Sequence, residues 1–200
     1  DARRIAQAAL PLDHTQLRLP RTDEGARAAL RILIASRDHI TNERTAAINT
    51  GRGLLREFGC AIPAGADKVR PAVLAALEDG DNDIPMALRH ALAGLLDQIV
   101  ACQEAMAAIE KQLADIAKLD TRCQRLMAAS GVGLITATAL SAGIGDFARF
   151  PSGRHFASAL GLTPREYSSG GTRKLGRITK QGAVFLRTLP LHGARSATTV

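Results

Sequence analysis

The chain has 200 residues, of which 46% are hydrophobic and 22% charged, so it can form a folded core and is not a disordered chain. Only 3% are aromatic, whereas alanine and leucine are abundant, a composition that favours helices over sheets. The net charge is +7, no continuous apolar run approaches the roughly 18 residues of a membrane span, and no signal peptide is visible.

The three cysteines, Cys60, Cys102 and Cys123, are too widely spaced for a disulfide framework, and their number is odd. No CxxC or Cys/His cluster with metal-ligand spacing occurs, which argues against a structural zinc site. A reducing, cytoplasmic environment is therefore expected.

The first 80 residues predict one long helix between shorter elements. Residues 1–10 are expected to form a short helix and residues 11–20, with a proline at each end, an extended link. A long helix is predicted over 22–58, where the first residue, a threonine, is a good N-cap. A loop over 59–70 and a short helix over 71–80 follow. The stripe of the long helix, interrupted by two arginines, consists of Leu30, Leu33, Arg37, Ile40, Arg44, Ala47, Leu54 and Phe58.

The clearest periodicity predicts a second long helix over residues 85–128, with Asp83 as its N-cap. Apolar residues recur alternately four and three positions apart, as in a coiled-coil seam. Such a helix would be roughly 65 Å long, too long to bury its stripe within a small globule. We expect it to pair with the first long helix, with another subunit or with both, and an intramolecular helical hairpin is the plainer alternative. The seam residues are Leu88, Leu92, Leu95, Ile99, Cys102, Met106, Ile109, Leu113 and Ile116.

Past residue 128 the pattern changes to glycines between helices. The segment Ser130-Gly131-Val132-Gly133 separates the long helix from LITATALSAGIGD and predicts a helix-hairpin-helix. In such a motif, glycine N–H groups and a helix N-terminus can bind a phosphate. A tight turn between helices requires no ligand, so the turn itself is the alternative reason for Gly131 and Gly133.

Two further helices are predicted in the C-terminal quarter. One runs from Ser152 to Gly161, a residue type that suits a helix C-terminus. The other covers 183–197, and Pro190 should kink or interrupt it. Between them, residues 163–182 are polar, basic and rich in glycine, and an irregular exposed loop is expected.

Positive charge is concentrated at the C-terminal end. Residues 149–200 contain nine Lys/Arg and a single acid, Glu166, whereas the first 148 residues carry 17 Lys/Arg and 18 Asp/Glu. This asymmetry predicts a polyanionic partner, most often nucleic acid. The candidate nucleic-acid-binding residues are Gly131, Gly133, Arg154, Arg165, Arg173, Lys174, Arg177, Lys180, Arg187 and Arg195.

Two serines lie within the basic loop, in the segment Tyr167-Ser168-Ser169-Gly170-Gly171. A serine that attacks a phosphodiester must approach phosphorus closely, which flanking glycines permit, and guanidinium groups stabilise the added negative charge. The spacing alone favours a flexible DNA-binding loop whose serines bond phosphate oxygens, and a serine nucleophile is the alternative. Tyr167, the only tyrosine, could itself be a nucleophile, but packing or stacking is its plainer role.

Several of these segments together resemble one known family. GVGLITATALSAGIGDFARF, GRHFASALGLTPREYSSGG, RKLGRITKQG and LRTLPLHGARSA follow one another as in the C-terminal domain of the insertion sequence one-ten transposases, which are related to the Piv and MooV DNA invertases. The resemblance covers about residues 130–197. It departs at Thr172, where the family usually has lysine, and at Pro190, where it usually has an aliphatic residue.

The resemblance implies a DNA strand-transfer enzyme with two catalytic parts. The serine before Gly-Gly would form the covalent link to DNA, which assigns the nucleophile to Ser169, with Ser168 as substitute, and reverses the preference from spacing. The start of the chain resembles the end of a RuvC-like domain, so Asp1 would be the last carboxylate of a DEDD tetrad that binds Mg²⁺. A structured guide RNA is also implied as a partner.

The expected organisation is residues 1–21 as the tail of the RuvC-like domain, 22–128 as a helical coiled-coil region and 129–200 as the C-terminal transposase domain. The fold class is mainly α, with a long antiparallel coiled coil and a small helix-hairpin-helix-like domain that carries the serine loop. The expected function is a transposase/recombinase fragment that binds DNA and forms homo-oligomers at the bacterial nucleoid, in the cytoplasm and away from membranes. With three carboxylates missing, the chain alone should be inactive. The alternative is a non-catalytic nucleic-acid-binding and oligomerisation module.

Overall fold

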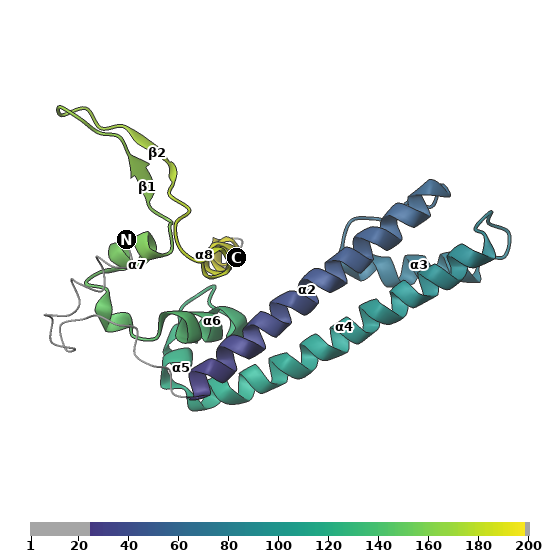
Figure 1. Ribbon diagram of the computed structural model, residues 1–200, viewed down its shortest axis with the longest axis horizontal. Helices are drawn as coiled ribbons and strands as arrows, with labels where there is room; N and C mark the ends of the chain where they lie inside the picture. The colour runs from purple at the N-terminus through teal and green to yellow at the C-terminus, as the bar shows by residue number, and fades with distance from the viewer. Residues whose placement is uncertain (1–24, 199–200) are drawn as a thin grey trace, which may run out of the picture.

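The computed structural model describes residues 25–198 and is mainly helical, as the composition predicts (Figure 1). The predicted helix over 1–10, the link over 11–20 and Asp1 lie outside the described residues. Two long helices, α2 (Gly25–Glu57) and α4 (Met86–Leu119), form a hairpin. A short helix packs at its closed end, and the C-terminal helices gather at its open end.

The long helices lie side by side and run in opposite directions, because Leu55 shares a cluster with Leu92 while Arg37 lies opposite Glu110. The Arg37 Nε donates to the Glu110 carboxylate at 2.7 Å, which gives one of the arginines in the α2 stripe a partner. Every predicted seam residue of α4 is buried or half-buried, so α2 covers the seam within the chain. This is the arrangement of the plainer alternative, an intramolecular hairpin.

The predicted stripe of α2 needs correction at its end. Phe58 lies beyond the last helical residue and is 38% exposed, whereas Ile48 and Leu55 are almost fully buried. Ile34 is likewise buried, and the predicted Leu33 is only half-buried. Over nine turns a helix with 3.6 residues per turn drifts from a strict seven-residue repeat, so the buried face shifts along the sequence.

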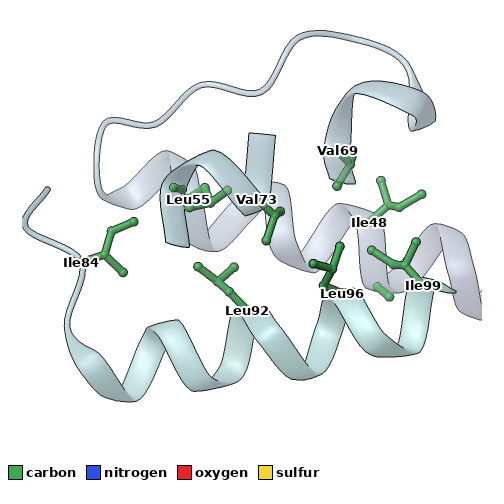
Figure 2. Close-up of a cluster of buried hydrophobic side chains, with 10 residues drawn as sticks. Ile48, Leu55, Val69, Val73, Ile84, Leu92, Leu96 and Ile99 are labelled. Atoms are coloured by element: carbon green, nitrogen blue, oxygen red, sulfur yellow. The ribbon is translucent and has the colours of Figure 1, made fainter. Parts of the chain in front are cut away.

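At the closed end, a cluster of buried aliphatic side chains holds α2, α4 and a short third helix together (Figure 2). Helix α3 (Val69–Glu78) follows a short 3₁₀ helix, η1 (Ala66–Lys68), and begins two residues earlier than predicted. Its Val69 and Val73 are buried in the same cluster as Leu55 and Leu92 of the long helices.

The turn between α3 and α4 differs from its prediction because Ile84 is buried in the same cluster. Helix α4 therefore begins after Pro85, and Asp83 does not cap it. Instead the Asn82 side chain accepts the N–H of Ile84 at 3.2 Å and donates to the Ala76 carbonyl at 2.7 Å. The burial of one isoleucine thus decides where the helix starts.

The single helix predicted over 85–128 is wrong, because the chain bends at Asp120 (φ −93°, ψ 106°). The Asp120 carboxylate accepts the backbone N–H of Arg122 at 2.8 Å and so caps a separate helix, α5 (Thr121–Met127). Its other oxygen accepts the hydroxyl of Ser141 at 2.7 Å and the thiol of Cys123 at 3.4 Å. Burial raises the pKa of that thiol to about 11, so it stays protonated at neutral pH.

We expect Asp120→Asn to lower the free energy of unfolding at pH 7 by about 1–3 kcal/mol. Burial alone would raise the pKa of the Asp120 carboxyl, but hydrogen bonds from Ser141, the backbone of Arg122 and Cys123 outweigh burial and lower it. The ionised carboxylate therefore stabilises the fold above its unfolded pKa of about 3.9, and this contribution is lost as the pH falls through the lower folded pKa. Urea unfolding at pH 7 and pH 3 should show the difference between the two proteins shrinking in acid. Asp97→Asn, at an exposed position of α4, is the control, and an equal difference at both pH values for Asp120→Asn would refute the assignment.

The C-terminal part shares a core with the open end of the hairpin. Helix α6 (Leu134–Ile144) packs its Ala139 and Ala142 against buried residues of both long helices, Leu30, Ile34 and Leu113. Helix α8 (Val184–Thr198) covers the same cluster with Phe185, Leu186 and Leu189. It continues through Pro190, so the predicted interruption does not occur.

Between α6 and α8 lie the 3₁₀ helix η2 (Phe147–Arg149) and α7 (Gly153–Ala159). The predicted stop at Gly161 is confirmed: this residue has φ +71° and its N–H donates to Ser158, while the N–H of Leu162 donates to Ala157. This pair of bonds is the Schellman arrangement of a helix C-terminus.

Helix α4 is long and apolar enough to cross a membrane, but core helices of soluble proteins can have the same length and composition. In this structure its apolar stripe is packed on α2.

Candidate functional site

The basic segment predicted to be an irregular loop is a β-hairpin. Strand β1 (Pro164–Glu166) pairs antiparallel with β2 (Leu175–Ile178), with an irregularity between the two matched ends. We call residues 164–178 the arm, and Figure 1 shows that it projects away from the helices. The sequence signal that could have revealed it is Gly170-Gly171, because two glycines between short extended runs favour a two-residue hairpin turn.

The tip of the arm is that two-residue turn. Ser169 and Thr172 close it, with their backbone N–H and C=O groups joined by hydrogen bonds of 3.3 and 3.1 Å. Gly170 and Gly171 have φ of +58° and +81°, and positive φ at both central positions is what a type I′ turn requires. A Cβ at either glycine would meet no other described atom within 4 Å, so the backbone beside Ser169 is open.

The two serines have different environments. The Ser168 hydroxyl donates to Glu166 at 2.7 Å and accepts the backbone N–H of Lys174 at 3.1 Å, so it ties the two sides of the arm together. The exposed Ser169 hydroxyl has no hydrogen-bond partner among residues 25–198. Of the two, Ser169 is therefore the hydroxyl available to an external group.

Tyr167 has a packing role in the arm. Its ring lies across the backbone of Gly176, where an added Cβ would be only 3.0 Å from Tyr167 Cε2. Its N–H donates to the Lys174 carbonyl at 2.8 Å. A ring over a cross-strand glycine stabilises a short hairpin, so packing accounts for Tyr167 in this structure.

Most predicted cations are exposed. Four lie on the arm, where the only acid, Glu166, is hydrogen-bonded to Ser168, and the others flank it on α7, on the segment after β2 and on α8. The arm is thus an electropositive projection whose local field favours a polyanion. The exposed cations are Arg154, Arg165, Arg173, Lys174, Arg177, Lys180 and Arg195, whereas Arg187 is buried.

Gly131 and Gly133 lie at the turn between α5 and α6, but in different environments. Gly131 has φ +79°, and an added Cβ would be 2.3 Å from the carbonyl oxygen of Gly193 in α8. Gly131 is thus explained by its place in the tight turn and by its close packing on α8, a contact that the sequence did not predict. Gly133 is exposed at the start of α6, where an added Cβ would touch none of the described residues, and phosphate binding there stays a prediction.

The predicted magnesium site is not assembled by the part of the chain that the structure describes. No group of three or more His, Cys, Asp or Glu side chains within residues 25–198 could hold a metal ion, and Asp1 lies outside that range. The described residues therefore do not fit such a site by themselves.

Comparisons with known proteins agree with the resemblance. Residues 123–200 match the model of a family described as Transposase IS116/IS110/IS902. A "Probable family 20 transposase" of Pseudomonas aeruginosa is 36% identical over 200 residues, 98% of this chain and 57% of the relative. The transposases for insertion sequence elements IS1111A of Coxiella burnetii and IS1328 of Yersinia enterocolitica are each 34% identical, over 98% and 88% of this chain and 53% and 51% of their own lengths. The chain spans about half the length of these curated relatives.

Proposed function

Because residues 123–200 match the model of the IS116/IS110/IS902 transposase family, we propose that this chain is the DNA-binding and strand-transfer part of a transposase. The observation that carries the proposal is the arm, which presents the Ser169 hydroxyl at an open two-glycine turn on a cation-rich hairpin. A projecting hairpin can reach a phosphodiester that a flat protein surface would hold away from a short serine side chain.

In the proposed reaction, the Ser169 hydroxyl loses its proton and its Oγ attacks a DNA phosphorus. One oxygen–phosphorus bond of the phosphodiester breaks as the Oγ–phosphorus bond forms, and the departing deoxyribose oxygen takes up a proton. Attack by a deoxyribose hydroxyl of another strand then reverses these changes and frees the serine. Each step exchanges one phosphodiester for another, so no external energy source is needed.

The arm cations have two roles in this proposal. They neutralise backbone phosphates and so hold the DNA along the arm. Guanidinium groups also stabilise the extra negative charge of the pentacoordinate phosphorus. Arg173 and Lys174 follow the tip directly, in place of the lysine that the family usually has at position 172.

The remaining parts of the proposal come from the resemblance. A DEDD tetrad would hold Mg²⁺, which would supply Lewis-acid chemistry, and Asp1 is the one tetrad member proposed within this chain. A structured guide RNA would select the target, and copies of the chain would associate through the α2–α4 hairpin. The cytoplasm is the proposed location because the DNA substrate is there.

A non-catalytic nucleic-acid-binding module is the second candidate, and the exposed cations favour it as much as they favour the transposase. The two candidates differ only in the covalent step. Trapping a protein–DNA adduct that survives denaturation would decide between them, because a binding module forms none.

Both candidates predict steeply salt-dependent DNA binding through the arm. The logarithm of the affinity for duplex DNA should fall with the logarithm of salt by about 0.9 per phosphate contacted. Replacing Arg173 and Lys174 together by glutamine should flatten that slope by about 1.8, measured by fluorescence anisotropy. The matched control replaces Arg56 and Arg70, exposed cations near the closed end of the hairpin, and makes the same change in net charge. If both pairs changed the slope equally, the arm would not be the binding surface.

A further inference from the structure

Arg187 is set apart from the other predicted DNA-binding cations by its burial. It is 8% exposed, and its Nη1 donates to the backbone carbonyl of Gln181 at 3.4 Å. No carboxylate pairs with it among residues 25–198. Burying a cation without a counter-ion costs free energy of folding. We therefore look for the role of Arg187 in the carbonyl group that its guanidinium binds.

The carbonyl that it holds belongs to the base of the arm, which we define as residues 159–163 and 179–182. Here the two legs of the arm touch backbone to backbone. A Cβ on Gly161 would be 2.0 Å from the Gln181 oxygen, and a Cβ on Gly182 would be 2.4 Å from the Ala159 oxygen. The N–H of Lys180 donates to Gly161 at 3.1 Å, and the N–H of Thr179 donates to Thr163 at 2.9 Å.

Arg187 connects this base to the helical body. It lies in the first turn of α8, directly after Leu186, which packs so closely on α6 that a Cβ on Gly143 would be 2.6 Å from Leu186 Cδ1. Further along, Gly193 of α8 touches Gly131 backbone to backbone. The Gln181 carbonyl is thus held between Gly161 on one side and a guanidinium anchored on α8 on the other.

We propose that Arg187 is a positioning residue, which fixes the direction of the arm from α8 and does not contact nucleic acid. This inference rests on the proposed function of the arm. Without the guanidinium, the base loses its side-chain link to α8 and its backbone hydrogen bonds open more often, so the tip no longer meets its phosphate in one orientation.

The test compares Arg187→Gln with Arg177→Gln, which removes an exposed cation from β2. Hydrogen exchange of the Thr179 and Lys180 amides should be about tenfold faster or more in Arg187→Gln and unchanged in Arg177→Gln. The salt slope of DNA binding should respond in the opposite way, unchanged in Arg187→Gln and flatter by about 0.9 in Arg177→Gln. Arg187→Lys, which keeps a donor, should restore slow exchange in part.

Two results would overturn the proposal: a salt slope in Arg187→Gln that flattens as in Arg177→Gln, or base amides whose exchange does not change. Gly182→Ala provides an independent route if Arg187→Gln fails to fold, because its Cβ would clash with Ala159 and should loosen the same two amides. Fast exchange in neither folded variant would also refute the inference. The exchange measurement needs no DNA chemistry, so a failure of the proposed strand transfer would be seen separately, as a missing adduct.

Discussion

Ser169→Ala is expected to abolish the covalent protein–DNA adduct, a loss of about 1000-fold or more, while DNA affinity changes little. Ser168→Ala should keep adduct formation within about tenfold, because it removes internal hydrogen bonds and no reacting atom. The contrast follows from the structure, in which Ser168 is bonded to Glu166 and Lys174 while Ser169 has no partner within residues 25–198.

The adduct is detected as labelled DNA that stays attached to protein on a denaturing gel. The protein used is extended to the full length of its relatives. Thr172→Val is the matched control, since Thr172 is the other hydroxyl-bearing residue whose backbone closes the turn. The opposite pattern, an adduct lost in Ser168→Ala and retained in Ser169→Ala, would make Ser168 the nucleophile and Glu166, at 2.7 Å, its base. No adduct in any version would favour the binding module.

Gly131→Ala should destabilise the fold by about 2–5 kcal/mol, a large effect for the addition of a single methyl group. The new Cβ would lie 2.3 Å from the Gly193 carbonyl oxygen, and φ of +79° is strained for alanine. Neither backbone can yield easily, because Gly193 lies within α8 and Gly131 lies in the short turn between α5 and α6, and α6 and α8 pack in the core at the open end of the hairpin.

Urea unfolding checks this prediction, with Gly133→Ala as the neighbour control. That substitution adds the same methyl group where the described residues leave space, at φ −84°, and should cost about 1 kcal/mol or less. If Gly131→Ala folded as stably as the unchanged chain but lost DNA affinity, Gly131 would serve phosphate binding rather than packing.

The helices could be predicted because their apolar side chains repeat at helical spacing over many turns. The bend at Asp120 could not, since it depends on a hydrogen bond to Ser141, 21 residues away. The start of α4 depends in the same way on the burial of Ile84 in a cluster formed by three helices. Contacts of this kind override local patterns without leaving a periodic signal.

At the candidate site, charge and composition predicted a basic surface but not its shape. The arm strands are short, exposed and without alternating apolar residues, so only Gly170 and Gly171 marked the hairpin. Counting charges treated Arg187 like Arg177, although one is buried and the other exposed. The sequence spacing could not show which serine is available either, because Ser168 differs from Ser169 only in its hydrogen bonds to Glu166 and Lys174.

The shared core of Leu30, Ile34 and Leu113 with Ala139 and Ala142 has a consequence for protein engineering. A cut near residue 129, where the composition changes, would remove the long-helix side chains that α6 packs against. The excised C-terminal piece would then expose the apolar face of α6 to water. Chimeras between relatives should therefore exchange α6 and α8 together with the facing turns of both long helices. The cooperative unit of folding crosses the boundary that composition alone would draw.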